Sequence, residues 1–421
     1  MDKLVVTGGH KLKGRVTISG SKNSALPILA ATLLTPEKCT IHNVPDLSDI
    51  RFMLAILRFL GSEVTFEHGT VTVKAEKIHA EAPYDLVRKM RASICVLGPL
   101  LARCGEAIIS LPGGCVIGDR PVDIHLKGME ALGAQVATEG GNVVARASKL
   151  RGVEIYLGSK FGSTVLGTDN VMMAATLAEG TTVIEGAACE PEVKDLAEFL
   201  NKMGAKIRGH GTRRIEIEGV KGLHGVEHTV IPDRIEAGTF MIASLITKGE
   251  VTVEKMEPGH LNNFIERMKS CGAQFRVGPD WVTSTVPRKM ASLDVVTETY
   301  PGFPTDMQAQ LCALMSVTDG ISVITDKIFP NRFMHLPELK RMGAKVDLEG
   351  STAIITGVPG LSAAPVMASD LRASAALVLA GLVAKGRTEV NRVYHIDRGY
   401  EQIDVKLRAL GAEIERVKSP A

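Results

Sequence analysis

The chain has 421 residues, with 49 lysines and arginines against 47 aspartates and glutamates, so its formal net charge is only +2. This balance argues against a general binder of nucleic acid or acidic membranes, and 4% aromatic residues are too few for a surface that stacks bases. No uncharged apolar run reaches about 18 residues, so no membrane span is predicted. Seven cysteines without a CxxC pair indicate a reducing compartment, by default the cytoplasm.

One short phrase recurs six times along the chain, each time as a hydrophobic residue, a glycine, a small residue, a polar residue and a hydrophobic residue. Its copies are LGSEV, LGAQV, MGAKI, CGAQF, MGAKV and LGAEI, beginning at Leu60, Leu132, Met203, Cys271, Met342 and Leu410. A second phrase, such as AEGTTVIEG from Ala178, recurs between the copies. Two phrases locked to one period of roughly 70 residues predict six copies of one structural unit.

Each repeat predicts the same elements in the same order. A helix of small apolar residues comes first, as in 172–178 or 373–384, and its uniformly apolar surface is typical of a buried helix. A glycine turn and a β-branched strand follow, as in 181–184. An amphipathic helix over 193–203 then ends at Gly204, and 214–218 alternates polar and apolar residues. The pattern predicts helices inside and sheets outside, in two domains of three repeats that meet near 219–232.

Cys115 is the sharpest candidate for chemistry. It lies in PGGCVIGDR, which occurs in one repeat only, and Arg120 follows five residues later. A nearby cation lowers the pKa of a thiol, so this cysteine is a candidate nucleophile or general acid, with an incidental surface thiol as the alternative. The other six cysteines lie mostly in apolar contexts and are interpreted as core residues.

Several cations lie next to predicted buried helices. Lys22, in SGSKN, comes just before an apolar helix, where a lysine and backbone N–H groups suit an anion; a solvated side chain is the alternative. Four arginines precede or open helices: Arg91, Arg332, Arg372 and Arg398. For Arg372 the alternative is an ion pair with Asp370, and for Asp306 it is a helix N-cap. These groups suggest a pocket for a small polyanion.

No cofactor motif is evident. His125 follows Asp123 without a second histidine at metal-ligand spacing, and neither a P-loop nor a dinucleotide-binding fingerprint occurs. The residues alone therefore lead to a two-domain enzyme for an anionic small molecule, with a structural repeat protein as the alternative.

Taken together, eight motifs are highly specific, and the chain resembles the UDP-N-acetylglucosamine enolpyruvyl transferases of bacterial cell-wall synthesis from Lys3 to about Arg416. The motifs are GSKNSALPILAA, RKMRASI, PGGCVIGDRPVDIH, PDRIEAGTFM, FPTDMQAQ, IFPNRFMH, SDLRASAALVLAGL and IDRGYE. The resemblance implies an α/β fold of two inside-out barrel domains, over 22–231 and over 1–21 with 232–421, and an active site in the cleft between them. It implies transfer of the enolpyruvyl group of phosphoenolpyruvate to the 3′-hydroxyl of UDP-N-acetylglucosamine, with no metal or organic cofactor.

The resemblance also implies roles for single residues. Cys115 would be the general acid and covalent partner, and Asp306 would take the 3′-hydroxyl proton. Lys22, Arg120 and Arg398 would hold the phosphate, Arg332 and Arg372 the carboxylate side, and Asn23 and Arg91 would border the pocket. The nucleotide would contact Arg120, Pro121, Val122, Asp123, Ile124, His125, Lys160, Asp306 and Ile328. The segment after Lys160 departs from the family pattern by two apparent insertions, and Thr164 and Val165 are the best counterparts for its diphosphate contacts.

Two alternatives remain within this resemblance. A shikimate-pathway enolpyruvyl transferase shares the fold and the chemistry, but it lacks the PGGC loop, and its GNAGTAMRP phrase does not occur in this chain. A non-catalytic paralogue that binds the sugar nucleotide is the other, and the intact set of cysteine, aspartate and arginines argues against it. Neither oligomeric state nor regulation follows from the sequence.

Overall fold

The structure is a computed structural model that describes residues 2–110 and 122–418. Its chain forms two compact units, one made of residues 2–19 and 232–418, which we call the terminal unit, and one made of residues 20–110 and 122–231, which we call the middle unit. The chain therefore crosses from one unit to the other twice, after residue 19 and after residue 231. None of the described helices is both long enough and apolar enough to span a bilayer.

The described residues form six sheets, and each has four strands in the same arrangement. In β10-β11-β13-β12, the first pair is parallel and the remaining pairs are antiparallel, so that an edge strand is added to a three-stranded antiparallel ladder. The strands of the middle unit are β3 (Lys38–His42), β4 (Glu63–Glu67), β5 (Thr70–Lys74), β6 (Glu81–Ala82), β7 (Glu106–Ser110), β8 (Gln135–Glu139), β9 (Asn142–Arg146), β10 (Glu154–Tyr156), β11 (Thr181–Glu185), β12 (Lys206–Arg208), β13 (Arg214–Glu218) and β14 (Glu227–Thr229).

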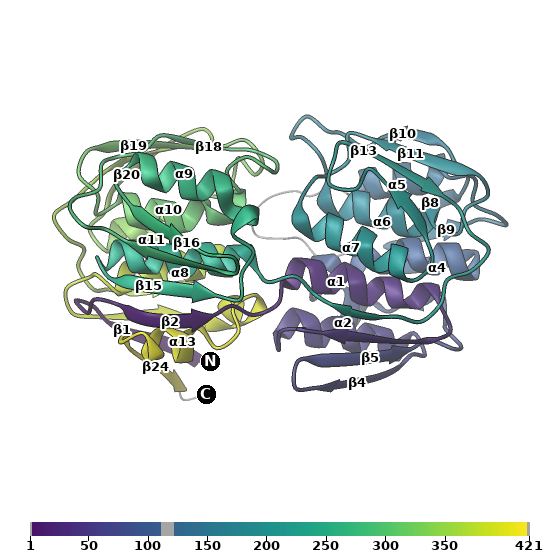
Figure 1. Ribbon diagram of the computed structural model, residues 1–421, viewed down its shortest axis with the longest axis horizontal. Helices are drawn as coiled ribbons and strands as arrows, with labels where there is room; N and C mark the ends of the chain where they lie inside the picture. The colour runs from purple at the N-terminus through teal and green to yellow at the C-terminus, as the bar shows by residue number, and fades with distance from the viewer. Residues whose placement is uncertain (1, 111–121, 419–421) are drawn as a thin grey trace. The chain divides into compact units, whose positions relative to one another are not determined.

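The terminal unit repeats this arrangement with strands from both ends of the chain. Its strands are β1 (Asp2–Thr7), β2 (Lys13–Thr17), β15 (Glu250–Glu254), β16 (Gln274–Val277), β17 (Trp281–Thr285), β18 (Val295–Thr297), β19 (Ile321–Asp326), β20 (Lys345–Glu349), β21 (Thr352–Thr356), β22 (Pro365–Met367), β23 (Arg387–Asn391) and β24 (Glu413–Lys418). The N-terminal strand β1 lies between β23 and β24, antiparallel to both (Figure 1). The sixth repeat therefore takes one strand of its sheet from the start of the chain.

Three helices fill the inside of each unit, and three more amphipathic helices pack beside them. The inner helices are α1 (Lys22–Ala31), α4 (Leu97–Cys104), α6 (Val165–Ala175), α8 (Arg234–Ile246), α10 (Gln308–Met315) and α12 (Leu371–Gly381). The amphipathic helices are α2 (Ser48–Phe59), α5 (Asp123–Ala131), α7 (Pro191–Lys202), α9 (Asn262–Ser270), α11 (Leu336–Arg341) and α13 (Ile403–Ala409). Shorter helices are α3 (Tyr84–Val87), η1 (Thr32–Leu34), η2 (Arg91–Val96), η3 (Pro258–Leu261), η4 (Thr305–Met307) and η5 (Val393–Arg398).

The burial of these elements follows the sequence pattern. Every residue of α8 after Arg234 is buried, whereas β13 buries Ile215 and Ile217 and exposes the charged residues between and beside them. Each unit has its own hydrophobic core. The predicted α/β fold with helices inside and sheets outside is confirmed.

The recurring glycine of the sequence phrase has one conformation in all six repeats. Its φ lies between 89° and 104° at positions 61, 133, 204, 272, 343 and 411. A side chain is strongly disfavoured in this left-handed region, so glycine ends each amphipathic helix and turns the chain into the following strand. The predicted helix end at Gly204 is confirmed.

A second glycine contact recurs where the last strand of a repeat meets the end of an inner helix. A Cβ on Gly219 would lie 1.7 Å from the carbonyl oxygen of Ala178, and a Cβ on Gly357 would lie 1.7 Å from that of Thr318. The backbone N–H of Gly219 also donates to the oxygen of Gly180 at 2.9 Å. Each of these oxygens belongs to the main chain, so the clash is relieved only by moving the strand away from the helix.

We expect Gly219→Ala to destabilise the middle unit by about 1–3 kcal/mol, the cost of overpacking a closely packed site. The change is measured as the midpoint of urea unfolding. Gly222→Ala is the matched control, because a Cβ there meets no atom within 4 Å and the backbone is not left-handed. Equal midpoints for the two variants would contradict this account of the contact.

The two crossing segments are held by a buried carboxylate of the terminal unit. Asp233 N donates to Ser19 O at 2.9 Å, and Glu236 accepts from Ser19 N at 2.8 Å and from Lys406 Nζ at 2.7 Å. Burial raises the pKa of Glu236 from 4.5 to about 7, although Lys406 and the Ser19 N–H oppose the rise and Asp233 adds to it. Glu236 is thus the carboxyl that joins the start of α8 to the end of the N-terminal segment.

This raised pKa predicts how stability changes with pH. Since the folded state holds the Glu236 proton more tightly than the unfolded state, the associated stability is fully present below pH 4.5 and is lost as pH rises through about 7. Between pH 5 and 8, the unaltered protein should therefore lose on the order of 2 kcal/mol relative to Glu236→Gln. Urea unfolding of both proteins at the two pH values measures this difference, and a difference independent of pH would refute the prediction.

Candidate active site

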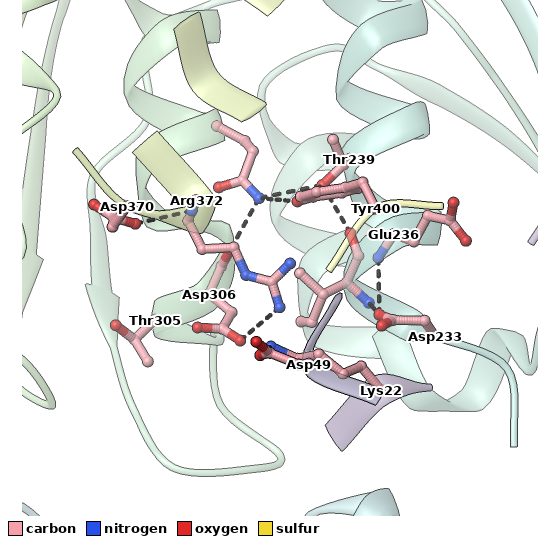
Figure 2. A network of polar contacts seen from close by, with 12 residues as sticks. Lys22, Asp49, Asp233, Glu236, Thr239, Thr305, Asp306, Asp370, Arg372 and Tyr400 are labelled. Atoms are coloured by element: carbon pink, nitrogen blue, oxygen red, sulfur yellow. Dashed lines mark hydrogen bonds and ion pairs between the residues drawn. The ribbon is translucent and has the colours of Figure 1, made fainter. Parts of the chain in front are cut away.

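Asp306 is the centre of a compact ionic cluster in the terminal unit. It lies in η4, directly before α10, and its carboxylate accepts from Arg332 Nη1 at 2.6 Å and from Arg372 Nη2 at 2.9 Å. The side chains of the two arginines are only 7% and 3% exposed, and that of Asp306 is 26% exposed. Figure 2 shows the Arg372 guanidinium turned toward this carboxylate. The structure thus brings three predicted site residues together from segments 26 to 66 residues apart.

The two cations determine the charge state of this carboxylate. Burial would raise the pKa of Asp306, but the charges and hydrogen bonds of Arg372 and Arg332 outweigh burial and hold the pKa well below its usual range. Arg332 Nε and both Nε and Nη1 of Arg372 are buried without a hydrogen-bond partner in the described chain. The cluster therefore has donor groups left over, and unsatisfied buried donors of this kind suit an anionic ligand.

Two of the alternatives that the sequence left open are wrong. Asp306 does not cap its helix through its side chain, since both carboxylate oxygens face the arginines. Arg372 does not form its ion pair with Asp370, because Asp370 caps α12 and accepts from the backbone N–H groups of Arg372 and Ala373 at 2.8 and 3.2 Å (Figure 2). The cap occupies Asp370 and leaves the Arg372 side chain for Asp306.

A fully buried carboxylate that the sequence reasoning missed, Asp326, supports this cluster at the end of β19. It accepts from the hydroxyls of Thr305 and Thr297 at 2.6 and 2.8 Å, and from the N–H groups of Ile328 and Phe329 at 2.9 and 2.8 Å. It thereby fixes the segment before Asp306 and the segment that carries half-buried Ile328 and leads to Arg332. No local sequence signal distinguishes Asp326 from other strand-end aspartates.

Lys22 forms a second buried ion pair, in the middle unit. It is the first residue of α1, is 9% exposed, and its Nζ lies 3.0 Å from Asp49 Oδ2 near the start of α2. The alternative of a solvated lysine is therefore wrong. The sequence reasoning did not find Asp49, which lies 27 residues away on the next helix. Half-buried Asn23 follows Lys22 in the first turn of α1.

The remaining cations lie at the ends of short helices. Arg91 is the first residue of η2, and Arg398 is the last residue of η5; both are partly buried and both have polar partners. Arg398 precedes α13, with Gly399 and two further residues between it and Gln402, the N-cap of that helix.

Several of the predicted nucleotide contacts in the described chain lie near two helix starts of the middle unit, whereas Asp306 and Ile328 lie in the terminal unit. Asp123 begins α5 and is exposed, with half-buried Val122 and Ile124 beside it. His125 is buried, its Nδ1 lies 2.9 Å from the side-chain nitrogen of Asn170, and burial together with Arg91 lowers its pKa to about 4. This imidazole is therefore neutral at physiological pH and accepts the Asn170 hydrogen bond through Nδ1.

The segment after Lys160, which departs from the family pattern, leads into the start of α6. Thr164 is its N-cap and accepts from Gly167 N at 3.2 Å, and half-buried Val165 is its first residue. Lys160 is exposed, with its Nζ 4.9 Å from the centre of the Phe161 ring. The Thr164 hydroxyl thus already has a structural partner.

Three predicted residues, Cys115, Arg120 and Pro121, lie outside the described residues. Of the six described cysteines, four are buried as expected, but Cys104 is exposed and Cys189 is half-buried, so their interpretation as core residues was wrong. Burial raises the pKa of Cys39 and Cys271 to about 11 and also raises that of the other four. None of the six has the lowered pKa that favours a reactive thiolate.

Comparison with known proteins gives one consistent result. Residues 6–407 match the family model of EPSP synthase (3-phosphoshikimate 1-carboxyvinyltransferase). The chain is 61% identical over 419 residues to a UDP-N-acetylglucosamine 1-carboxyvinyltransferase of Methylacidiphilum infernorum, covering 100% of both proteins. It is 57% identical over 420 residues to the protein of the same name from Akkermansia muciniphila, covering 99% of each.

Solved structures have the same fold. The enolpyruvyl transferase NikO from Streptomyces tendae matches with a TM-score of 0.91 and 26% identity, over 100% of this chain and 99% of that one. EPSP synthase from Acinetobacter baumannii matches with a TM-score of 0.74 and 18% identity, over 99% and 100% of the two chains, which shows the fold alone. The chain therefore belongs to the enolpyruvyl transferase family and, within it, to the UDP-N-acetylglucosamine 1-carboxyvinyltransferases.

Proposed function

We propose that this protein transfers the enolpyruvyl group of phosphoenolpyruvate to the 3′-hydroxyl of UDP-N-acetylglucosamine and releases phosphate, the first committed step of peptidoglycan synthesis. The observation that carries the proposal is the buried cluster of Asp306, Arg332 and Arg372 in a chain that is 61% identical to such an enzyme over its whole length. As part of the same proposal, the reaction takes place in the cytoplasm. The domains over 22–231 and over 1–21 with 232–421 both supply residues to it.

The chemistry needs a general acid, a general base and a site for a leaving phosphate. A proton first adds to the methylene carbon of phosphoenolpyruvate, and the central carbon becomes electrophilic. The sugar 3′-oxygen then bonds to that carbon while its proton goes to Asp306. The resulting phospho-ketal loses a proton from its methyl group as the carbon–oxygen bond to phosphate breaks, and the double bond is restored.

We assign the acidic step to Cys115 and the basic step to Asp306. Lys22, Arg120 and Arg398 bind the phosphate and stabilise the charge that it gains on leaving. Arg332 and Arg372 bind the carboxylate, and the buried, unpartnered N–H groups on both guanidiniums support this role. Asn23 and Arg91 border the same pocket.

The contacts of Asp306 indicate when it becomes a base. A carboxylate held between two guanidiniums is a poor proton acceptor, since its pKa lies well below the usual range. A substrate carboxylate on the remaining N–H groups of Arg332 and Arg372 brings a second negative charge close to Asp306 and raises its pKa. In this proposal, substrate binding therefore prepares Asp306 to accept the 3′-hydroxyl proton.

For the nucleotide, we propose a surface made of Arg120 to Ile124, Lys160, Thr164, Val165, Asp306 and Ile328. The start of α5, where Asp123 is exposed, supplies backbone N–H groups of the kind that suit a diphosphate. His125 was included among the contacts, but it is buried and bonded to Asn170, which supports a role in holding α5 rather than in touching the ligand.

The function is tested by measuring phosphate release from phosphoenolpyruvate with UDP-N-acetylglucosamine, with shikimate 3-phosphate, or with no acceptor. We expect release only with the sugar nucleotide, together with a product whose mass spectrum shows one added enolpyruvyl group. Release with shikimate 3-phosphate instead would identify a shikimate-type enzyme. Binding of the sugar nucleotide without release would identify a non-catalytic paralogue.

The role of Cys115 predicts that Cys115→Ser loses turnover by on the order of 10²- to 10⁴-fold, because a hydroxyl is a much weaker acid than a thiol. The rate of phosphate release measures this loss. Cys104→Ser is the control, since that thiol is exposed and is assigned no role, and it should keep full activity. Full turnover in Cys115→Ser would remove the thiol from the mechanism.

A further inference from the structure

Gln310 connects the Asp306 cluster to the interior of the terminal unit. It lies on α10 and has no exposed surface, and its Nε2 is within hydrogen-bond distance of three oxygens. These are the backbone carbonyl of Asp306 at 2.9 Å, the hydroxyl of Tyr400 at 3.1 Å and the hydroxyl of Thr239 at 3.1 Å. A carbonyl oxygen only accepts, so the nitrogen of the amide, and not its oxygen, must face these groups.

The protons of this network can be arranged so that each one has an acceptor. Thr239 donates to the carbonyl of Ile235 at 2.8 Å, so its oxygen is free to accept from Tyr400 at 2.9 Å. The Tyr400 oxygen in turn accepts one of the two amide protons of Gln310, and the Asp306 carbonyl accepts the other. Each donor in the chain from Asp306 to α8 thus has an acceptor, whereas Gln310 Oε1 is buried without a hydrogen-bond partner in the described chain.

Tyr400 connects this hydrogen-bond network to Arg372 of the Asp306 cluster. It is 1% exposed, and the Arg372 guanidinium lies 5.4 Å from the centre of its ring, at a distance suited to a cation–π contact. Figure 2 shows Tyr400 between Thr239 and Arg372. Gln310 therefore touches the peptide of Asp306 on one side and the hydroxyl of the ring beneath Arg372 on the other.

We propose that Gln310 is a positioning residue for the transfer reaction: its amide holds the Asp306 peptide to the Tyr400 hydroxyl and so sets the Asp306 carboxylate and the Arg372 guanidinium at a fixed separation. Gln310 itself touches no reacting atom. This role rests on the proposed function, because it concerns the base and the carboxylate-binding arginine of that reaction. Asp306 and Arg372 lie 66 residues apart in the sequence, so the chain itself does not fix the distance between their side chains. The buried hydrogen bonds of Gln310 and Tyr400 would hold that distance constant.

Gln310→Met removes the amide and keeps the length of the side chain. We expect kcat to fall by about 10- to 100-fold, the effect of a misplaced base, with a smaller rise in KM for phosphoenolpyruvate. The acidic limb of the pH profile of kcat/KM, which reports the free carboxylate, should also move to higher pH, because the freed Asp306 pairs less closely with its arginines. A residue with only a structural role would not shift this limb.

Gln308→Met is the matched control. Gln308 is on the same helix and is also fully buried, and among the described residues its amide nitrogen has only the Cys312 sulfur, at 3.6 Å, as a partner. It should match Gln310→Met in thermal stability and keep the kcat and pH profile of the unaltered protein. Equal kinetic losses in the two variants, or an unshifted acidic limb in Gln310→Met, would overturn the positioning role.

Tyr400→Phe keeps the test decisive if Gln310→Met does not fold. It removes only the hydroxyl, so we expect the same direction of change, a several-fold fall in kcat and an acidic limb moved to higher pH; unchanged kinetics would overturn the proposal. In the double variant the two losses should be less than multiplicative, since both act through one hydrogen bond.

If the unaltered protein releases no phosphate, the proposed function fails and the role of Gln310 fails with it. If it does release phosphate, only the variants decide the positioning role.

Discussion

The inner helices α1, α8 and α12 are buried along almost their whole length, and this constraint decides where charge can lie on them. A charged group in the middle of such a helix would lose its water without a partner, so the charges of α1, α8 and α12 are confined to the first turn. Lys22, Glu236 and Arg372 all occupy such positions. The candidates for chemistry therefore lie where the repeats begin their inner helices, and not along their length.

The same constraint explains the pairing of these cations with acids. The N-terminal end of a helix carries partial positive charge, so Lys22 and Arg372 are electrostatically unfavourable there on their own. Asp49 and Asp306 offset this cost in the structure. An anionic substrate group can offset the cost of these cations in the same way. In both ion pairs, a substrate anion can therefore take the place of the protein carboxylate. A site of this kind selects ligands by their negative charge more strongly than by their shape.

The fold could be predicted from the sequence to a large extent, because its determinants are local and repeated. The glycine at the end of each amphipathic helix, the uniformly apolar inner helices and the alternating strands each have a signal within a few residues. The candidate site could be predicted only in part. Lys22, Asp306 and Arg372 stand out beside apolar helices, but their partners do not, since Asp49, Asp326, Gln310 and Tyr400 reach the site through tertiary contacts. For the same reason the nearest acid in sequence, Asp370, was the wrong partner for Arg372: it serves the backbone of its own helix.

The position of β1 has a consequence for how the chain is made. Residues 20–231 contain every strand of their own three sheets, so this unit is complete once they leave the ribosome. Strand β1, in contrast, emerges before all of its partners and pairs only with Arg387–Asn391 and Glu413–Lys418, about 380 residues or more further along the chain. At about 5–20 residues per second, the N-terminal strand waits roughly 20–80 s for its partners. Throughout that interval its hydrogen-bonding edges are open, so the order of translation makes the N-terminal segment the part of the nascent protein that most needs protection from aggregation.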